Sequence, residues 1–465
     1  MKNNYGMKQN REKGAIQMET GSRPIPLELY IHIPFCIRKC AYCDFLSFPA
    51  GEEERSLYVE QLAREIEEAG AAFGEYVAET VFIGGGTPSV LEGAQIGRIM
   101  DAMRESFHLS EEAEITMEVN PGTASPEKLR SWRRSGINRL SLGLQSAQNR
   151  ELRYLGRIHT AEDFLESFHA AREAGFENIN VDLMSALPGQ TEEAWEDTLK
   201  KVLSLMPEHI SAYSLIIEEG TPFYEKYGTE GMERKGKARA RADLPPLPDE
   251  DMERSMYEAT ERILSEAGYH RYEISNYARP GFECRHNRGY WTGTEYLGLG
   301  LGASSYIIRN READLGGCPD EAGLLALSGA ERFLNTLDMG KYLAYSREDF
   351  RAGRHTEGRD RLTWKDRMEE FMFLGLRLTE GVAEQEFERR FGCPIRQVYG
   401  KALEECVREG LMEYVHDPAC SGSVSPDGLV QTQGKEALDS RWRLTGRGVD
   451  VSNWVLAKFL IDEKA

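Results

Sequence analysis

The chain has 465 residues and a formal net charge of −20 at pH 7, with 40% hydrophobic and 29% charged residues. This length is enough for two or three domains of roughly 100–200 residues each. The acidic balance argues against non-specific nucleic-acid binding, because contacts to phosphates need a basic surface. No apolar run approaches the roughly 20 residues of a membrane-spanning helix, so the composition indicates a soluble globular protein.

Residues 1–27 are polar and carry basic side chains without a following apolar core, which is not the pattern of a secretory signal. We expect them to form a disordered extension, with Met7 and Met18 as alternative starts. The eight cysteines comprise three clustered and five isolated residues. This pattern fits free thiols rather than a disulfide framework, so a reducing, cytoplasmic location is expected.

Six apolar, strand-like segments alternate with amphipathic, helical ones. The expected strands are 28–33, 80–83, 114–119, 139–144, 178–183 and 209–215, and the expected helices include 56–69, 94–107, 126–135 and 249–267. This β-then-α order implies an α/β fold in which helices pack outside a parallel sheet. A doubly wound sheet and a barrel both satisfy the pattern, and in both of them ligands bind at the carboxyl ends of the strands.

Two stretches interrupt this pattern, residues 226–248 and 310–330, and both are expected to be surface loops. From about Thr363 the pattern changes to helices with a short β segment near residues 442–444, which suggests a winged-helix-like domain. We therefore predict an N-terminal extension (1–27), a barrel (28–248), a closure and connecting segment (249–359) and a mainly helical C-terminal domain (360–465). The acidic balance favours a lid or partner-docking role for this last domain over DNA binding.

Cys36, Cys40 and Cys43 form the run C-x-x-x-C-x-x-C. Three thiolates on a four-iron, four-sulfur (4Fe-4S) cluster leave one iron open to a ligand that is not protein. The alternatives are a structural zinc site and three free thiols. Zinc sites usually close with four ligands, and no second cysteine pair lies nearby in the sequence to complete one. The spacing therefore favours the cluster.

Glycine-rich and polar motifs follow the expected strands. They are Gly84-Gly85-Gly86-Thr87-Pro88, Glu118-Val119-Asn120-Pro121, Gly143-Leu144-Gln145-Ser146, Leu155-Gly156-Arg157, and Asp182 followed by Leu187-Pro188-Gly189-Gln190. Glycines let a small molecule approach the backbone, carboxylates bind hydroxyl or amine groups, and an arginine binds a carboxylate. Each motif is weak evidence alone, but on one rim with the cysteines they indicate a pocket.

The run Tyr30-Ile-His-Ile-Pro-Phe-Cys36-x3-Cys40-x-Tyr42-Cys43-Asp44-Phe45 resembles the cluster loop of radical S-adenosylmethionine (SAM) proteins, specifically the group around oxygen-independent coproporphyrinogen III oxidase. The other motifs follow in that family's order, over about residues 28–300. The resemblance implies a partial (β/α)6 barrel, with SAM bound to the open iron. It also implies that the SAM pocket is lined by Tyr30, Tyr42, Gly85, Gly86, Thr87, Glu118, Gln145, Arg157 and Asp182.

Two features distinguish this chain within the family. The oxidases carry another cysteine two residues after the third cluster cysteine, where this chain has Phe45, which weakens the case for coproporphyrinogen decarboxylation. The element His286-Asn287-Arg288-Gly289-Tyr290-Trp291 is similar to the H-N-x-x-Y-W motif of the family's heme chaperone branch, where it is associated with heme binding. His286 is the candidate heme ligand, since imidazole ligates heme iron and aromatic rings offer flat faces to a porphyrin. The alternative is a satisfied core histidine.

Two functions are open at this point. The first is a heme chaperone that holds heme, a 4Fe-4S cluster and SAM and passes heme to an acceptor protein, with a membrane respiratory enzyme as one candidate acceptor. The second is an anaerobic coproporphyrinogen III oxidase that makes protoporphyrinogen IX. Nucleic acid is not an expected partner, and a monomer and a dimer are both open.

Overall fold

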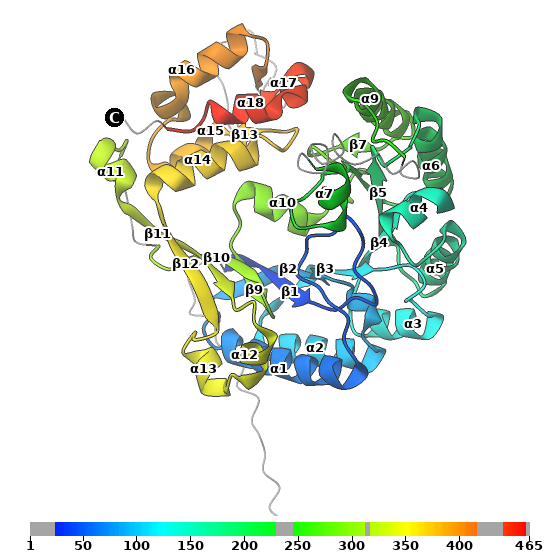
Figure 1. The fold of residues 1–465 in the computed structure, drawn as a ribbon. Helices are drawn as coiled ribbons and strands as arrows, with labels where there is room; N and C mark the ends of the chain where they lie inside the picture. The colour runs from blue at the N-terminus through cyan, green and yellow to red at the C-terminus, as the bar shows by residue number, and fades with distance from the viewer. Residues whose placement is uncertain (1–23, 229–244, 312–316, 416–439, 462–465) are drawn as a thin grey trace, which may run out of the picture.

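The computed structural model describes residues 24–228, 245–311, 317–415 and 440–461 (Figure 1). Its centre is a sheet with six parallel strands in chain order: β1 (Ile25–Ile33), β2 (Tyr76–Gly85), β3 (Leu109–Val119), β4 (Arg139–Gln145), β5 (Asn178–Ser185) and β6 (His209–Ser214). A doubly wound sheet reverses its strand order at a switch point, and this order has no reversal. Of the two predicted arrangements, the parallel strands therefore form the barrel and not the doubly wound sheet. Residues 1–23 and most of 226–248, for which an extension and a loop were expected, lie outside the described ranges.

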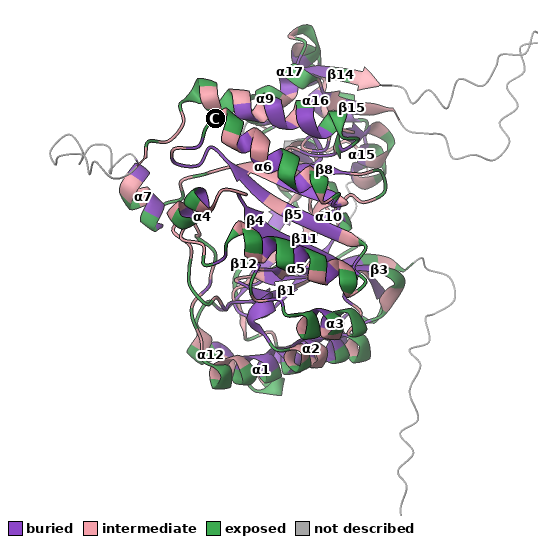
Figure 2. Ribbon diagram, turned by 90° about the vertical axis from the view of Figure 1, so that its right-hand side faces the viewer, coloured by how far each residue is buried: buried purple, intermediate pink, exposed green. Residues whose placement is uncertain are grey.

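Helices cover the outside of these strands in an arc (Figure 1). They are α1 (Glu52–Gly70), α2 (Gly93–Ser106), α3 (Pro126–Arg134), α5 (Ala161–Glu173), α6 (Glu192–Ser204) and α9 (Glu250–Glu266), with the shorter η1 (Pro88–Val90), α4 (Asn149–Leu155) and α7 (Pro222–Tyr227) after strand ends. In α2 the buried residues Ile96, Ile99, Met100 and Met103 follow the spacing of one helix face. The four expected helices are confirmed, with slightly different bounds. Figure 2 shows buried strands beneath helices whose outer faces are exposed.

The inside of the parallel sheet is polar. Side chains alternate between the two faces of a strand, and in β4 the residues Leu140, Leu142 and Leu144 join the hydrophobic core. The intervening positions face inward, where Arg139 and Ser141 line one cavity and Gln145 lines the rim pocket. A closed (β/α)8 barrel fills its centre with branched aliphatic side chains. This barrel keeps internal cavities instead.

The segment 249–359 extends this sheet on both sides. β8 (Asn276–Ala278) and β7 (His270–Arg271) continue it beyond β6, and β9 (Tyr296–Leu299) pairs in parallel with β1. The antiparallel β10 (Ser304–Ile308), β11 (Leu327–Asn335) and β12 (Thr356–Thr363) complete a 12-stranded sheet. The prediction of a surface loop over 310–330 is therefore wrong at its C-terminal end, since α11 (Glu321–Leu325) and the start of β11 lie there. α12 (Met339–Ala344) and α13 (Arg347–Arg351) pack against α1.

The C-terminal elements pack around a core of their own. They are α14 (Trp364–Gly375), β13 (Val382–Ala383), α15 (Glu384–Phe391), α16 (Ile395–Arg408), β14 (Met412–Val415), β15 (Arg441–Leu444), α17 (Gly446–Asp450) and α18 (Ser452–Ala457). The expected β segment is β15, which lies between β13 and β14 in a small antiparallel sheet. α14 packs against α10 (Arg285–Thr292), which carries the H-N-x-x-Y-W element (Figure 1). None of the helices in the described ranges has both the length and the apolar character needed to cross a membrane.

Candidate functional site

A pocket of about 440 Å³ opens at the carboxyl ends of the parallel strands. Its volume is in the range of small-molecule sites, roughly 300–1,000 Å³. It gathers most of the predicted site residues: Cys36, Cys40, Tyr42, Cys43, Gly85, Gly86, Thr87, Glu118, Gln145, Arg157 and Asp182. Phe45 lies at its mouth and is 64% exposed. Two predicted residues, Tyr30 and His286, line a second cavity deeper in the barrel instead.

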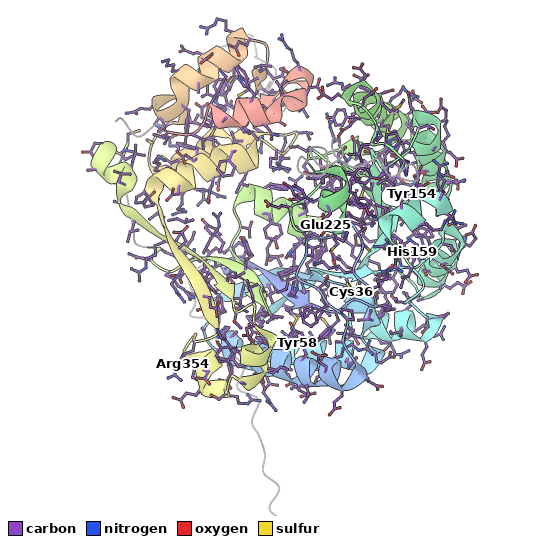
Figure 3. All side chains as sticks on the ribbon, in the orientation of Figure 1. Cys36, Tyr58, Tyr154, His159, Glu225 and Arg354 are labelled. Atoms are coloured by element: carbon purple, nitrogen blue, oxygen red, sulfur yellow. The ribbon has the colours of Figure 1, made fainter. Side chains whose placement is uncertain are left out.

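The three cysteines lie on the loop after β1, and all three are partly exposed. Backbone hydrogen bonds fix this loop, because Cys36 N donates to Phe48 O at 3.1 Å and Ala41 N donates to Leu155 O at 2.9 Å. In Figure 3, Cys36 lies near the middle of the molecule, between Tyr58 of α1 below it and Glu225 of α7 above it. The loop thus presents its thiols to the pocket from an anchored backbone.

Gly85 and Gly86 bring the end of β2 against the start of the cysteine loop. Gly85 has a φ of +111°, which favours glycine, and a Cβ there would lie 2.5 Å from the His32 ring. Gly86 N donates to Ile33 O at 2.9 Å, and a Cβ on Gly86 would lie 2.7 Å from Phe35 O. A side chain at Gly86 would push the two backbones apart, and one at Gly85 would meet the ring of His32.

Replacing Gly86 with alanine should lower the free energy of unfolding by about 1–3 kcal/mol, because the new methyl group meets backbone that cannot rotate away. Gly97, inside α2, is the matched control, since a Cβ there meets only Ser135 Oγ at 3.7 Å. Gly97→Ala should raise stability by about 0.5–1 kcal/mol through helix propensity. Urea unfolding of the three proteins measures both effects, and an equal change in both variants would contradict the expectation.

Glu118 and Asp182 place two carboxyl groups on one side of the pocket. Burial, and then the charge of Asp182, raises the pKa of Glu118 to about 8. Gly85 N donates to Glu118 Oε2 at 3.0 Å. Asp182 accepts hydrogen bonds from Ser141 Oγ at 2.9 Å and from Tyr213 Oη at 2.8 Å. A ligand ammonium group beside this pair would favour the ionised form of Glu118.

Arg157 places a cation on the side of the cysteines. Its Nη2 donates to Asn120 Oδ1 at 2.9 Å and to Gly143 O at 2.8 Å, and its Nη1 lies 3.7 Å from Cys40 Sγ. Its Nε is buried and has no hydrogen-bond partner among the described residues. Gln145 has a φ of +70° at the end of β4, a conformation that is costly for a residue other than glycine and typical of functional sites. The pocket thus offers a carboxyl pair and, beside Cys40, a guanidinium.

Several polar residues that line the pocket were not in the predicted set, among them Asn120, Ser141 and Tyr213. Asn120 belongs to the quoted Glu-Val-Asn-Pro motif, so its signal was present. Ser141 and Tyr213 sit on β4 and β6 and hold Asp182 in place. Counting alternate residues back from each strand end identifies such inward positions.

His286 lies in the deeper cavity, whose volume is about 220 Å³. Its Nδ1 is 2.7 Å from Thr80 Oγ1 and its Nε2 is 3.1 Å from Tyr290 Oη. Burial, and then the charge of Arg139, lowers the pKa of His286 to about 3. Glu114 accepts from the backbone N–H of His286 at 3.2 Å, which fixes the start of α10. The predicted heme ligand is therefore a buried, neutral imidazole with both ring nitrogens in hydrogen bonds.

Comparison with known proteins identifies the family. Residues 30–202 match the model of the radical SAM superfamily, and residues 362–414 match the HemN C-terminal domain. The chain is 34% identical to the heme chaperone HemW of Lactococcus lactis over 438 residues, which is 94% of this chain and 98% of that protein. The chain belongs to the HemW family. HemW of Bacillus subtilis is 36% identical over 384 residues, or 82% of this chain and 92% of that one.

The fold also matches a solved structure. Coproporphyrinogen III oxidase (HemN) from Escherichia coli, a radical SAM enzyme, superposes with a TM-score of 0.70 at 23% identity, over 94% of this chain and 90% of that one. This likeness, together with the radical SAM family match, confirms the expected α/β fold with its partial barrel and smaller C-terminal part. The expected membership of the coproporphyrinogen oxidase-like radical SAM group, on the HemW side, is confirmed as well. The domain boundaries given above stay predictions.

Proposed function

We propose that this protein is a heme chaperone that works in the cytoplasm, binds heme, carries a 4Fe-4S cluster with SAM, and transfers heme to an acceptor protein. The observation that carries this proposal is the similarity over nearly the whole chain to a protein named heme chaperone HemW. The position of Phe45 at the pocket mouth adds support, because the oxidases have a cysteine there. A membrane respiratory enzyme is one candidate acceptor.

The pocket fits the proposed cluster and SAM. Cys36, Cys40 and Cys43 would each bind a different iron, so their sulfur atoms need not converge on a single point. Within the described ranges, no set of three or more His, Cys, Asp or Glu side chains is arranged to hold one metal ion. The amine of SAM would lie by Glu118, and its carboxylate would lie by the partly buried Arg157. Bound SAM supplies a sulfonium that a reduced cluster can cleave by one-electron transfer.

His286 is our proposed heme ligand, under one structural condition. The cavity that it faces, about 220 Å³, is smaller than the roughly 300–1,000 Å³ of typical ligand pockets, so heme cannot reach it with α10 in this position. Binding would require α10 to move away from the barrel. It would also require the Tyr290 hydroxyl to give up its hydrogen bond with Nε2 of His286. The neutral imidazole that burial favours is the form that ligates metals.

His286→Ala should weaken heme binding by roughly tenfold or more, the scale of losses seen around metal ligands. His159→Ala is the matched control, because His159 is also buried, with its pKa lowered to about 4 by burial, and does not line either cavity. Titration of heme absorbance with the full-length protein measures both affinities. Heme binding of His286→Ala equal to that of the parent would remove His286 as the ligand and leave the family function standing.

The chaperone and oxidase functions differ in their products. Reconstituted protein with a reductant, SAM and coproporphyrinogen III, kept anaerobic, should form no protoporphyrinogen IX. The same protein loaded with heme should lose it to membranes containing a heme-depleted respiratory enzyme, followed by the change in heme absorbance. Sustained protoporphyrinogen formation would contradict the chaperone proposal and support the oxidase.

A further inference from the structure

Arg139, the first residue of β4, is a buried cation that forms no ion pair within the described ranges. It is 2% exposed and lines the deeper cavity. Its Nε has no hydrogen-bond partner, and no carboxylate of the described residues lies within ion-pair distance of the guanidinium. Arginine does not release its proton in proteins, and a buried charge without a partner is costly. The barrel interior therefore holds a cation that Glu114 and Asp182 stabilise through space but that forms no direct ion pair with a described residue.

The nearest acidic groups are already engaged. Glu114 and Asp182 both influence Arg139 through space, but neither forms an ion pair with it. Glu114 accepts hydrogen bonds from the backbone N–H groups of Arg285 and His286 at the start of α10. Asp182 accepts from Ser141, Asn180 and Tyr213. These contacts leave the guanidinium free to bind an added anion.

Besides Glu118, the cavity wall holds one other carboxyl group, Asp182, which already accepts hydrogen bonds from Ser141, Asn180 and Tyr213. Apart from Arg139, the other titratable groups of the wall are held neutral. Burial lowers the pKa of His209, as it does that of His286, so both imidazoles are neutral. With no ammonium group bound beside it, the raised pKa of Glu118, about 8, keeps that carboxyl protonated at neutral pH. Tyr30, Phe82 and Tyr290 supply aromatic surface next to these groups. A carboxylate joined to a short apolar arm fits such a mixed wall.

The deeper cavity lies directly beneath the pocket of about 440 Å³ that contains the three cysteines, called the cofactor pocket below. The two share four lining residues: Glu118, Ser141, Asp182 and Tyr213. We propose that the deeper cavity is a binding site for a carboxylate on a short alkyl arm, anchored by the guanidinium of Arg139. The ligand is either a free short-chain acid or the propionate arm of a porphyrin, and in the second case the inference rests on the proposed heme function. A volume of about 220 Å³ suits the arm and not the porphyrin ring.

The first test uses sodium propionate and its neutral analogue propionamide on the full-length protein. Saturation-transfer NMR should show saturable binding of propionate and at least about tenfold weaker binding of propionamide, since hydrogen bonds between charged groups are the strong ones. Equal binding of the two, or no propionate binding up to tens of millimolar, would overturn the proposal. This comparison needs no variant, so it stands even if a change at Arg139 prevents folding.

The second test replaces Arg139 with methionine. Arg139→Met should bind propionate at least about tenfold more weakly than the parent. Arg285→Met is the control, because Arg285 is exposed and pairs with Glu79 at 2.7 Å outside the cavity. Propionate affinity that is unchanged in Arg139→Met would overturn the role of Arg139.

Heme and heme dimethyl ester distinguish the two possible sources of the carboxylate, which are a porphyrin arm and a free short-chain acid. If a porphyrin arm is the ligand, the parent should bind heme more tightly than the ester, and Arg139→Met should bind both alike. If a free acid is the ligand, the arginine change should affect propionate alone. A protein that binds propionate and no heme would contradict the proposed function and leave the anion site standing.

Discussion

Replacing Cys36 with serine should remove the iron–sulfur cluster and leave the fold intact. Cys36 sits on a partly exposed loop and takes no part in the hydrophobic cores. Its loss would leave two thiolates where a 4Fe-4S cluster with an open iron needs three. Iron and sulfide per chain, measured after anaerobic reconstitution, should fall at least about tenfold. Far-UV circular dichroism should match that of the parent.

Cys318→Ser is the matched control for this experiment. Cys318 is also a partly exposed free thiol, but it packs against the C-terminal core and does not line the cofactor pocket. It should keep the full iron and sulfide content. Full iron and sulfide in the Cys36 variant would refute the assignment, and zinc in place of iron in the parent would support the structural zinc alternative.

Replacing Glu28 with glutamine should flatten the pH dependence of stability. Glu28 is 3% exposed inside the barrel, and its Oε2 has no hydrogen-bond partner within the described part of the chain. Burial, and then the charge of Glu114, raises its pKa from 4.5 to about 9. Between pH 4.5 and about 9, the Glu28 carboxyl is ionised in the unfolded chain but still protonated in the folded protein. The unfolding free energy contributed by Glu28 is therefore present below pH 4.5 and is lost as the pH rises towards 9.

Glutamine has no proton to lose, so the variant should gain stability relative to the parent by up to about 1.4 kcal/mol per pH unit over this window. Glu118 and Glu65, whose pKa values burial raises to about 8 and about 7, act in the same direction in both proteins and cancel in the comparison. Urea unfolding at pH 5–9 measures the difference. The exposed Glu177→Gln provides the control, and parallel curves for Glu28→Gln and the parent would disprove the expectation.

The parallel strands, and the pocket residues at their carboxyl ends, were predictable because both depend on local sequence. β4, for example, alternates leucines with small or polar residues and ends at Gln145, so one short segment specifies both its strand and its pocket residue. The peripheral strands escaped prediction for the opposite reason. β7 and β13 have two residues each, and half of the residues of β12 are charged, so none shows an extended apolar pattern. Their pairing depends on neighbours elsewhere in the chain.

The placement of His286 and Tyr30 could not be read from motifs. The H-N-x-x-Y-W element marks His286 as a candidate ligand but not its direction. Contacts with Thr80 on β2 and Glu114 on β3, far away in the sequence, decide that His286 faces inward. Tyr30 precedes the end of β1 by three residues, so it lies below the rim, with its hydroxyl 3.1 Å from His32 Nδ1. Arg139 stands out only when the cavity and its partners are seen together.

The outermost strand β12 also has a consequence for association between chains. It ends one side of the 12-stranded sheet, so one row of its N–H and C=O groups lacks a partner strand in the described ranges. Its exposed residues include Glu357, Arg359, Asp360 and Arg361. A second chain adding a strand here would have to pack its side chains against these charges, which is how natural sheets resist edge-to-edge aggregation. Charge at the margin of this long open sheet thus opposes the addition of a strand from another chain.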